Sequence, residues 1–434
     1  MKRSGIVLLS LAALLLGAGA LVWQHNFNDG VDVSAVPPAP PAAEAAALVA
    51  RGAYLARAGN CAACHTGRGG APYAGGRGIE TPFGTVYGSN LTPDPATGIG
   101  RWNAAEFWRA PHHGRSKDGR LLSPAFPYTS TTQITRTDAD ALFAYLMQLP
   151  PVVQPNRPHA LRWPYGTQVA QAVWRSLYFR PVANAEAPAD PARSAEWNRG
   201  AYLVRGLGHC AGCHSARNAL GATGGDNDLT GGLIPMQNWY APALTRAGEA
   251  GVADWELPHI VTLLKTGQSP RGQVTGPMAE VVQHSTQHLT DADLGAMASY
   301  LKSLPQTGDA AKPPPVAAGT IKLGRGAKLY ENHCAQCHGE RGEGVAGAYP
   351  ALAGNRAVTM AQTTNLVQTV LHGGFAPATT GNPRPFGMPP YVLVLNDADV
   401  AAVLTHLRAS WGNAAAEVTE LDVNRVRAST GDGR

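Results

Sequence analysis

The sequence predicts a mainly α-helical protein that consists of three tandem domains with long loops, preceded by a hydrophobic helix. The motif Cys-x-x-Cys-His occurs three times, at residues 61–65, 210–214 and 334–338, and the three copies contain all six cysteines of the chain. The 434 residues include 50 glycines and 34 prolines, which favour long ordered loops between the helices.

Each motif is expected to lie between two helices. A near-copy of the pentapeptide Arg-Gly-Ala-Tyr-Leu begins at Arg51, Arg199 and Arg325, and each copy leads as a short helix into its motif. A second helix closes each repeat, over 135–149, 290–304 and 396–407, because a Thr or Asn cap is followed by apolar residues at three- and four-residue spacing. The repetition predicts three copies of one structural unit.

The motif Cys-x-x-Cys-His is typical of covalent haem attachment. The two thiols form thioether bonds to the porphyrin vinyl groups, and the adjacent histidine binds the iron. We therefore expect three covalently bound haem c groups, with iron bound by His65, His214 and His338 and porphyrins attached through Cys61, Cys64, Cys210, Cys213, Cys334 and Cys337. Two helices and long loops around one haem correspond to a class I-like cytochrome c domain.

Other uses of the cysteines fit less well. A structural zinc site needs four ligands from paired elements, whereas each cysteine pair here stands alone with its own histidine. A thioredoxin-like motif is single and lies near a βαβ unit, and a disulfide framework suits a small secreted domain. The pattern therefore favours electron transfer. The sequence contains no flavin or nicotinamide fingerprint and no convincing catalytic triad, so nothing in it indicates substrate chemistry on this chain.

A sixth iron ligand is predicted for two of the three haems. Met278 lies 11 residues after Gly267, in the segment Gly-Pro-Met-Ala-Glu, and Met388 lies 15 residues after Gly373, in Phe-Gly-Met-Pro-Pro. Thioether sulfur is a common axial ligand of haem iron. The alternative is that both are core methionines, which is the usual role of this residue.

The first repeat departs from this pattern. Seven identities at an offset of 153 residues align the first two repeats, and the alignment places Phe126, in Pro-Ala-Phe-Pro-Tyr, close to the position of Met278. Phenylalanine cannot bind iron, so haem 1 either lacks a protein sixth ligand or uses another residue. His112 and His113 are the alternatives, although His112 aligns with Lys265, which predicts a surface position.

A haem-binding histidine usually donates its other ring N–H to a backbone carbonyl or a similar acceptor. In cytochromes c this carbonyl commonly belongs to a proline, and Pro242 and Pro350 fit that role for the second and third sites. The matching residue in the first repeat is Ser89. We therefore expect the first haem to have a reduction potential of its own.

The N-terminus begins Met-Lys-Arg and continues with an uncharged stretch over residues 4–23. This segment is either a signal peptide or a retained membrane anchor, and its length favours the anchor. Both alternatives predict export of the remainder, in agreement with haem attachment outside the cytoplasm. The expected boundaries are 1–30 for this segment, 31–48 for a Pro/Ala linker, 49–150 for domain 1, 151–195 for a connector, 196–306 for domain 2, 307–318 for a linker, 319–412 for domain 3 and 413–434 for a polar, extended tail.

Charge and composition add two expectations. The formal net charge of +5 is nearly offset by the propionates of three haems, so the sequence gives no reason to expect nucleic-acid binding. The connector combines aromatic residues with arginines, which indicates either a surface that docks on a membrane or a partner, or a helix packed across two domains.

Several segments resemble the triheme cytochrome c subunit of membrane-bound bacterial dehydrogenases, over roughly residues 48–412. Besides the haem motifs, these segments are residues 81–86, 90–95, 97–102, 194–200 and 276–282. The resemblance implies a non-catalytic electron-transfer subunit on the periplasmic side of the cytoplasmic membrane. Such a subunit takes electrons from a catalytic subunit and passes them to ubiquinone or the terminal oxidase chain, with Met278 and Met388 as axial ligands.

Catalytic partners in that family are of three kinds: pyrroloquinoline quinone (PQQ) alcohol dehydrogenases, flavin (FAD) sugar or gluconate dehydrogenases, and molybdenum enzymes with iron–sulfur subunits that oxidise aldehydes or N-heterocycles. The alcohol dehydrogenase branch has methionine where this chain has Phe126. The segment Pro-Ala-Phe-Pro-Tyr therefore favours the molybdenum kind. A more remote alternative is a haem enzyme that reacts at an open haem 1.

Overall fold

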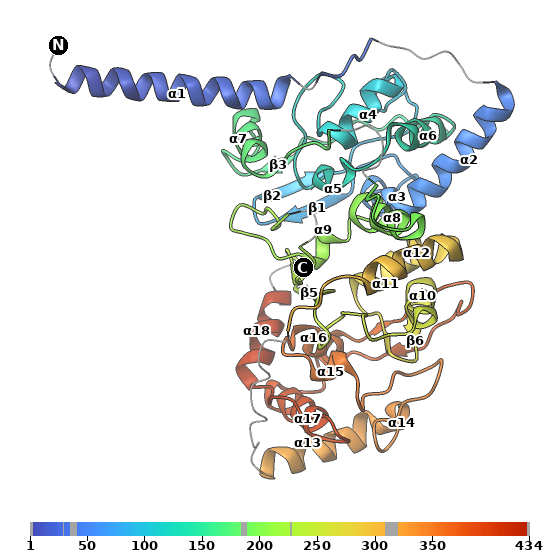
Figure 1. Cartoon of the computed structure of the whole chain (residues 1–434). Coiled ribbons are helices and arrows are strands. Elements are labelled where there is room, and N and C mark those ends of the chain that lie inside the picture. The colour runs from blue at the N-terminus through green and yellow to red at the C-terminus, as the bar shows by residue number, and fades with distance from the viewer. Residues whose placement is uncertain are drawn as a thin grey trace. The chain divides into compact units, whose positions relative to one another are not determined.

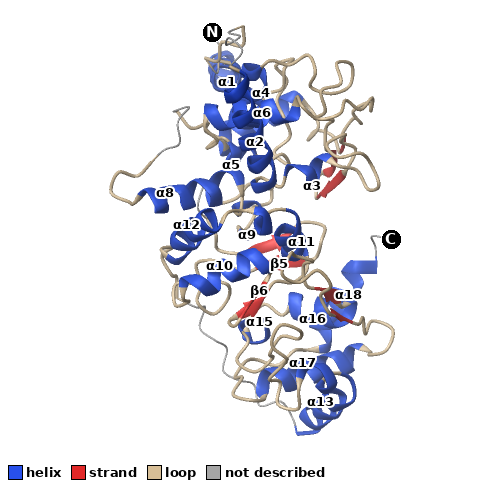
Figure 2. Cartoon of the chain, turned by 90° about the vertical axis from the view of Figure 1, so that its right-hand side faces the viewer, coloured by secondary structure: helices blue, strands red, loops and turns tan. Residues whose placement is uncertain are grey.

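The computed structural model describes residues 3–28, 30–34, 41–183, 189–225, 228–308 and 320–431. These residues are mainly helical, with short antiparallel sheets between the helices (Figures 1 and 2). The chain separates into two compact units. The first contains Met1–Ala189, Arg205–His209 and Asn218–Ala222, and the second contains Asp190–Val204, Cys210–Arg217 and Thr223–Arg434.

The first unit holds the N-terminal helix, the first predicted domain and the connector. Strands β1, β2 and β3 form one antiparallel sheet in that order, with Gly78 opposite Tyr87 and Gly84 opposite Leu161. The elements are α1 (Arg3–Phe27), α2 (Ala42–Ala58), α3 (Cys61–His65), β1 (Gly78–Thr81), β2 (Gly84–Tyr87), α4 (Ala104–His113), α5 (Tyr128–Thr131), α6 (Arg136–Leu146), β3 (Ala160–Leu161) and α7 (Gln168–Tyr178).

The second unit holds the second and third predicted domains. The described part of domain 2 comprises α8 (Ala195–Tyr202), the π-helix η1 (Leu203–Leu207), α9 (Ala211–His214), β4 (Gly232–Ile234), β5 (Trp239–Ala241), α10 (Leu257–Thr266), β6 (Gln268–Ser269), β7 (Gly272–Gln273), α11 (Pro277–His284), the 3-10 helix η2 (Thr286–His288) and α12 (Asp291–Lys302). Residues 205–207 of η1 belong to the first unit. Domain 3 comprises α13 (Thr320–His333), α14 (Ala335–His338), α15 (Arg356–Thr359), α16 (Thr364–His372), β8 (Gly374–Phe375), β9 (Gly387–Met388), α17 (Asp397–Ala409) and α18 (Glu420–Gly431).

The first and last helices of each repeat cross in close contact, and a glycine lies at each crossing. A Cβ atom added at Gly52, Gly200 or Gly326 would overlap the backbone carbonyl of Ala141, Ala296 or Ala402, respectively. The glycine shared by the three pentapeptides is therefore required by the approach of the two backbones. The pairs are α2 with α6, α8 with α12, and α13 with α17.

An ion pair joins the same two helices in all three repeats. The arginine before each crossing glycine binds an aspartate in the first turn of the closing helix: Arg51 with Asp138 at 2.5 Å, Arg199 with Asp293 at 2.7 Å and Arg325 with Asp399 at 2.6 Å. The backbone N–H of each aspartate also donates to the cap residue, which is Thr135, Thr290 or Asn396. The predicted caps are confirmed, and they place each carboxylate opposite its arginine.

Two expectations about irregular segments were wrong. The linker expected over 31–48 is partly helical, because α2 already begins at Ala42; residues 35–40 lie outside the described residues. The tail is not extended along its length, because α18 forms within it and packs against α16 and α17. Val418, Val423 and Val426 bury their side chains in the core of domain 3, and this burial stabilises the tail.

The N-terminal segment forms α1, as the sequence predicts. Within the part of the chain that the structure describes, no helix is both long enough and apolar enough to cross a membrane. The anchor therefore stays a prediction.

The glycine crossing makes a prediction about stability. We expect Gly326→Ala to lower the free energy of unfolding by about 1–3 kcal/mol, because the added methyl group forces α13 away from α17. Gly324→Ala, two residues earlier on the exposed side of α13, meets no atom within 4 Å and is the matched control. That variant should raise helix stability by up to about 1 kcal/mol. Thermal unfolding of the haem-loaded protein measures both, and equal stability of the two variants would contradict the close crossing.

Candidate cofactor sites

Each Cys-x-x-Cys-His motif forms a helical turn. In repeats 1 and 3 this turn closely follows the first helix, and in repeat 2 the π-helix η1 lies between them. In each turn the histidine Nδ1 lies within hydrogen-bond distance of a backbone carbonyl: Ser89 for His65 at 2.7 Å, Pro242 for His214 at 2.7 Å and Pro350 for His338 at 3.0 Å. A carbonyl can only accept, so Nδ1 donates and Nε2 is the nitrogen left to bind iron. The three predicted carbonyls are confirmed.

These carbonyls are held by short antiparallel pairings. The hairpin β1–β2 ends at Tyr87, two residues before Ser89, and the hairpin β4–β5 ends at Ala241, next to Pro242. In domain 3 a single bridge between Val345 and Tyr349 precedes Pro350. The strands thus fix the orientation of each histidine ring from outside the motif.

The six cysteines form no disulfide in the described structure, and their surroundings suit a covalent apolar group. Burial together with the second thiol of each motif raises the pKa of Cys61 and Cys210 to about 12 and that of Cys334 to about 11. Among the described residues, no group of three or more His, Cys, Asp or Glu side chains is arranged to hold a metal ion. Cys64 and Cys213 are exposed and the other four cysteines are half-buried, and each pair has a single histidine beside it, which fits thioether attachment of a porphyrin better than a bare metal site.

Met388 is the predicted axial ligand of the third site. It forms β9 with Gly387 and pairs with Gly374 in β8. Its side chain packs on the domain 3 core, and Cys334 and Ala335 of the haem motif pack against the same core. A Cβ atom at Gly373 would overlap the Met388 carbonyl, so the two backbone segments touch at this point. Motif and methionine therefore share one apolar cluster.

Met278 is the second residue of the short helix α11 of domain 2. Its side chain packs against Val274, Ala279 and Val282, so it is half-buried. The preceding Gly276 has a positive φ of 55°, and its Cα approaches the Trp239 ring so closely that a side chain would not fit. The turn before α11 is thus fixed by packing, which suits a ligand that must be held in place.

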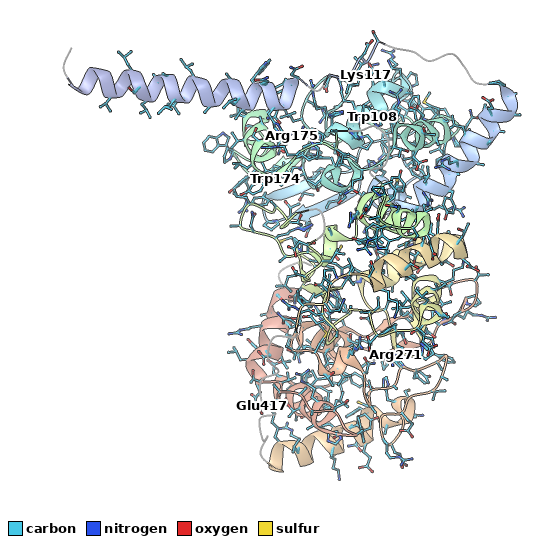
Figure 3. All side chains as sticks on the ribbon, in the orientation of Figure 1. Trp108, Lys117, Trp174, Arg175, Arg271 and Glu417 are labelled. Atoms are coloured by element: carbon cyan, nitrogen blue, oxygen red, sulfur yellow. The ribbon has the colours of Figure 1, made fainter. Side chains whose placement is uncertain are left out.

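The corresponding segment of the first unit carries Phe126, half-buried and two residues before α5. The neighbouring alternatives are on α4, and the expectation that His112 lies at the surface was wrong: its side chain is 2% exposed. His112 stacks on Trp108, which is labelled in Figure 3, at 4.3 Å between ring centroids. Its Nε2 lies 3.0 Å from the carbonyl of Val182 in the connector. Burial lowers the pKa of His112, so it is neutral there. His113 is also buried.

The second unit contains contacts between its two haem domains that sequence reasoning missed. Asn365 on α16 accepts from the backbone N–H of Tyr240 at 2.8 Å and donates to its carbonyl at 2.7 Å. Asp254 of domain 2 binds Arg356 of domain 3 at 2.6 Å and Arg271 at 2.9 Å. Tyr240 lies on the strand that leads to Pro242, so domain 3 is joined directly to the element that orients His214. Asn365 and Arg356 bind residues of the preceding repeat, and no local pattern signals these pairings.

The cytochrome c family model matches residues 49–150, 198–305 and 323–411, and each matched segment contains one motif. The chain belongs to the cytochrome c family. Three matched domains, each with a Cys-x-x-Cys-His turn whose histidine is oriented by a carbonyl, mean three covalent haem c groups.

Relatives in this family match almost the whole chain. The cytochrome c subunit of a quinone-dependent alcohol dehydrogenase from Gluconacetobacter polyoxogenes is 42% identical over 88% of this chain and 84% of its own length. The gluconate 2-dehydrogenase cytochrome c subunit of Pantoea cypripedii is 39% identical over 88% of this chain and 90% of its own. One of the subunits of nicotinate dehydrogenase from Pseudomonas putida is 40% identical over 95% of this chain, which corresponds to 34% of that longer protein.

The attachment sites can be tested one at a time. We expect the double variant Cys210→Ala, Cys213→Ala to carry two haems per chain in place of three, because both thioether bonds of one motif are lost. Mass spectrometry of the intact protein and the pyridine haemochrome assay measure the haem content. Ser215→Ala, just beyond the motif, is the control and should keep three haems; an unchanged haem content in the double variant would rule out attachment at this motif.

Proposed function

We propose that this chain is the electron-transfer subunit of a membrane-bound periplasmic dehydrogenase complex and performs no substrate chemistry itself. The observation that supports the proposal most directly is the presence of three haem motifs with carbonyl-oriented histidines in one chain. Its relatives over 88% of the chain are cytochrome c subunits of alcohol and gluconate dehydrogenases. Several one-electron centres in one polypeptide suit a relay between a catalytic subunit and a membrane acceptor.

In this proposal the residues of each site have distinct roles. The cysteine pairs Cys61 and Cys64, Cys210 and Cys213, and Cys334 and Cys337 attach the porphyrins, while His65, His214 and His338 bind iron through Nε2. Met278 and Met388 supply the sixth ligand of the second and third haems. Bound haem c supplies reversible one-electron transfer. The carbonyls of Ser89, Pro242 and Pro350 hold each histidine in one tautomer and orientation.

The first site differs in its sixth ligand. Phe126 cannot bind iron, and His112 already places Nε2 against the Val182 carbonyl. We therefore infer that haem 1 has no methionine ligand and a reduction potential that differs from the other two, since axial ligation is a main determinant of haem potential.

Axial ligation gives a paired prediction. We expect Phe126→Met to add a third sulfur-ligated low-spin haem, and Met278→Leu to reduce the number from two to one. Magnetic circular dichroism of the ferric protein detects the sulfur-to-iron charge-transfer band, and carbon monoxide binding to the ferrous protein reports open sites. Met236→Leu, at an exposed position in domain 2, is the control. Three methionine-ligated haems in the unaltered protein would contradict the account of haem 1.

The catalytic partner we favour is a molybdenum enzyme with an iron–sulfur subunit that oxidises an aldehyde or an N-heterocycle. Two observations support this choice: Phe126 in the segment Pro-Ala-Phe-Pro-Tyr, and 40% identity to a nicotinate dehydrogenase subunit over 95% of this chain. A PQQ alcohol dehydrogenase or an FAD sugar dehydrogenase is the alternative, because the alcohol and gluconate subunits are similarly close. The acceptor is ubiquinone or the terminal oxidase chain, and residues 1–30 attach the chain to the cytoplasmic membrane or direct its export.

Purification of the complex tests this function. We expect the tagged chain, extracted from its native membranes in mild detergent, to bring down a large molybdopterin subunit and a small iron–sulfur subunit. Anaerobic addition of the partner's substrate should then reduce the haems of the complex and not those of the isolated chain. A quinoprotein or flavoprotein partner would keep the electron-transfer role but refute the molybdenum partner. Haem reduction by substrate in the isolated chain would contradict the non-catalytic role.

A further inference from the structure

One face of helix α7 in the connector is buried against the first unit, and its opposite face is exposed among the described residues. Gln171, Ala172 and Arg175 are buried against the first unit. Val169, Val173 and Leu177 follow each other at four-residue spacing on the other face, and their side chains are 74%, 45% and 62% exposed. We call these three residues the α7 stripe. A row of exposed aliphatic side chains on a well-capped helix indicates an interaction surface.

Aromatic side chains lie at both ends of the stripe. Trp163 precedes α7 and is 86% exposed, and Tyr178 at its end is also exposed. The Trp163 loop is held in place, because the Tyr165 ring packs on Phe83 at 4.7 Å and Thr167 caps α7. The exposure of these rings is therefore built into the fold. Amphipathic aromatic rings beside an aliphatic stripe are typical of segments at a membrane–water interface.

The end of α1 is joined to α7 (Figure 1). Asn26 donates from Nδ2 to the Ala172 carbonyl at 3.0 Å and accepts from Nε of Arg175 at 2.8 Å (Arg175 is labelled in Figure 3). Before this joint, α1 exposes large apolar side chains along its described length, which are Val7, Leu9, Leu11, Leu14, Leu15, Leu16, Leu21 and Trp23. Two uncovered apolar surfaces thus adjoin within the first unit.

The charge of this region indicates what kind of surface it binds. Residues 151–183 contain four arginines and no aspartate or glutamate, and α1 also lacks acidic residues. Arg175 is buried, whereas Arg157, Arg162 and Arg180 are exposed. Aliphatic side chains beside exposed arginines, with no carboxylate in α1 or in residues 151–183, match the combination of acyl chains and phosphate groups in anionic lipid.

We propose that the α7 stripe is seated on an anionic lipid surface, with α1 beside it, so that the first unit touches the membrane through its connector as well as through its N-terminus. The inference adds to the proposed function without depending on it, since lipid contact can be measured without a catalytic partner. It gives a reason for the long connector of domain 1: the segment places this domain at the membrane.

Spin labelling of the haem-loaded full chain tests the proposal. The six native cysteines are consumed by haem, so Val173→Cys provides a single reactive thiol for a nitroxide at the centre of the stripe. Leu393→Cys, at a 95% exposed position in the second unit, is the matched control. With vesicles of phosphatidylethanolamine and phosphatidylglycerol, we expect collisions of the label at 173 with a water-soluble nickel chelate to fall several-fold and those with oxygen to rise. The label at 393 should not change, and the effect at 173 should weaken with neutral phosphatidylcholine vesicles.

Three results would overturn the proposal. Equal accessibility of the label at 173 with and without vesicles means that the stripe does not meet lipid. Shielding without vesicles that grows with protein concentration identifies a second copy of the chain as the occupant. Shielding only in the purified complex, in detergent and without vesicles, assigns the stripe to the catalytic partner. None of these measurements uses substrate, so a result that overturns the lipid contact does not bear on the proposed electron-transfer function.

Discussion

Each haem domain depends on a contact between two helices that is close enough to exclude a side chain. The glycines at positions 52, 200 and 326 lie against the backbone of the closing helix, and the adjacent Arg–Asp pair sets the register of the two helices. In domains 1 and 3 the haem motif closely follows the first helix, so the crossing fixes where the thiols and the histidine begin. The strands and loops between the two helices then supply the carbonyl that orients the histidine.

Because the three domains share this contact, their differences lie in the loops. The second and third sites have a proline carbonyl behind the histidine and a methionine as the proposed sixth ligand, whereas the first has Ser89 and Phe126 at these positions. The elements between the first and last helices also carry the contacts between the domains of the second unit, through Asn365 on α16 and Asp254 in a loop. A scaffold that is constant at its helices and variable at its loops allows centres with different potentials in one chain.

Most of the scaffold could be predicted from sequence, because its signals are local. The haem motifs, the glycine before each motif and the Thr or Asn caps specify their surroundings within a few residues, and repetition makes them recognisable. The carbonyls of Pro242 and Pro350 followed from the alignment of the repeats. The predictions that were wrong concern residues that are buried by segments distant in the sequence. His112 aligns with Lys265 yet is buried, because the connector, which only domain 1 carries, places the Val182 carbonyl against it.

The prediction of an extended tail was wrong for a related reason. Its sequence is polar apart from a few valines, and α18 forms because α16 and α17 offer a surface on which Val423 and Val426 are buried. Arg427 adds hydrogen bonds to the carbonyls of Val392 and Leu395 and an ion pair with Asp397. Tertiary packing of this kind overrides a weak local preference for helix, and no pattern within the segment predicts it.

The central claim is that one chain carries three redox centres of which the first differs from the other two. An optical redox titration of the haem-loaded chain tests it most directly. The account predicts three one-electron equivalents per chain, with one haem titrating at a potential separate from the other two and shifting toward them in Phe126→Met. Fewer than three equivalents, or three haems that titrate together and ignore this substitution, would contradict it.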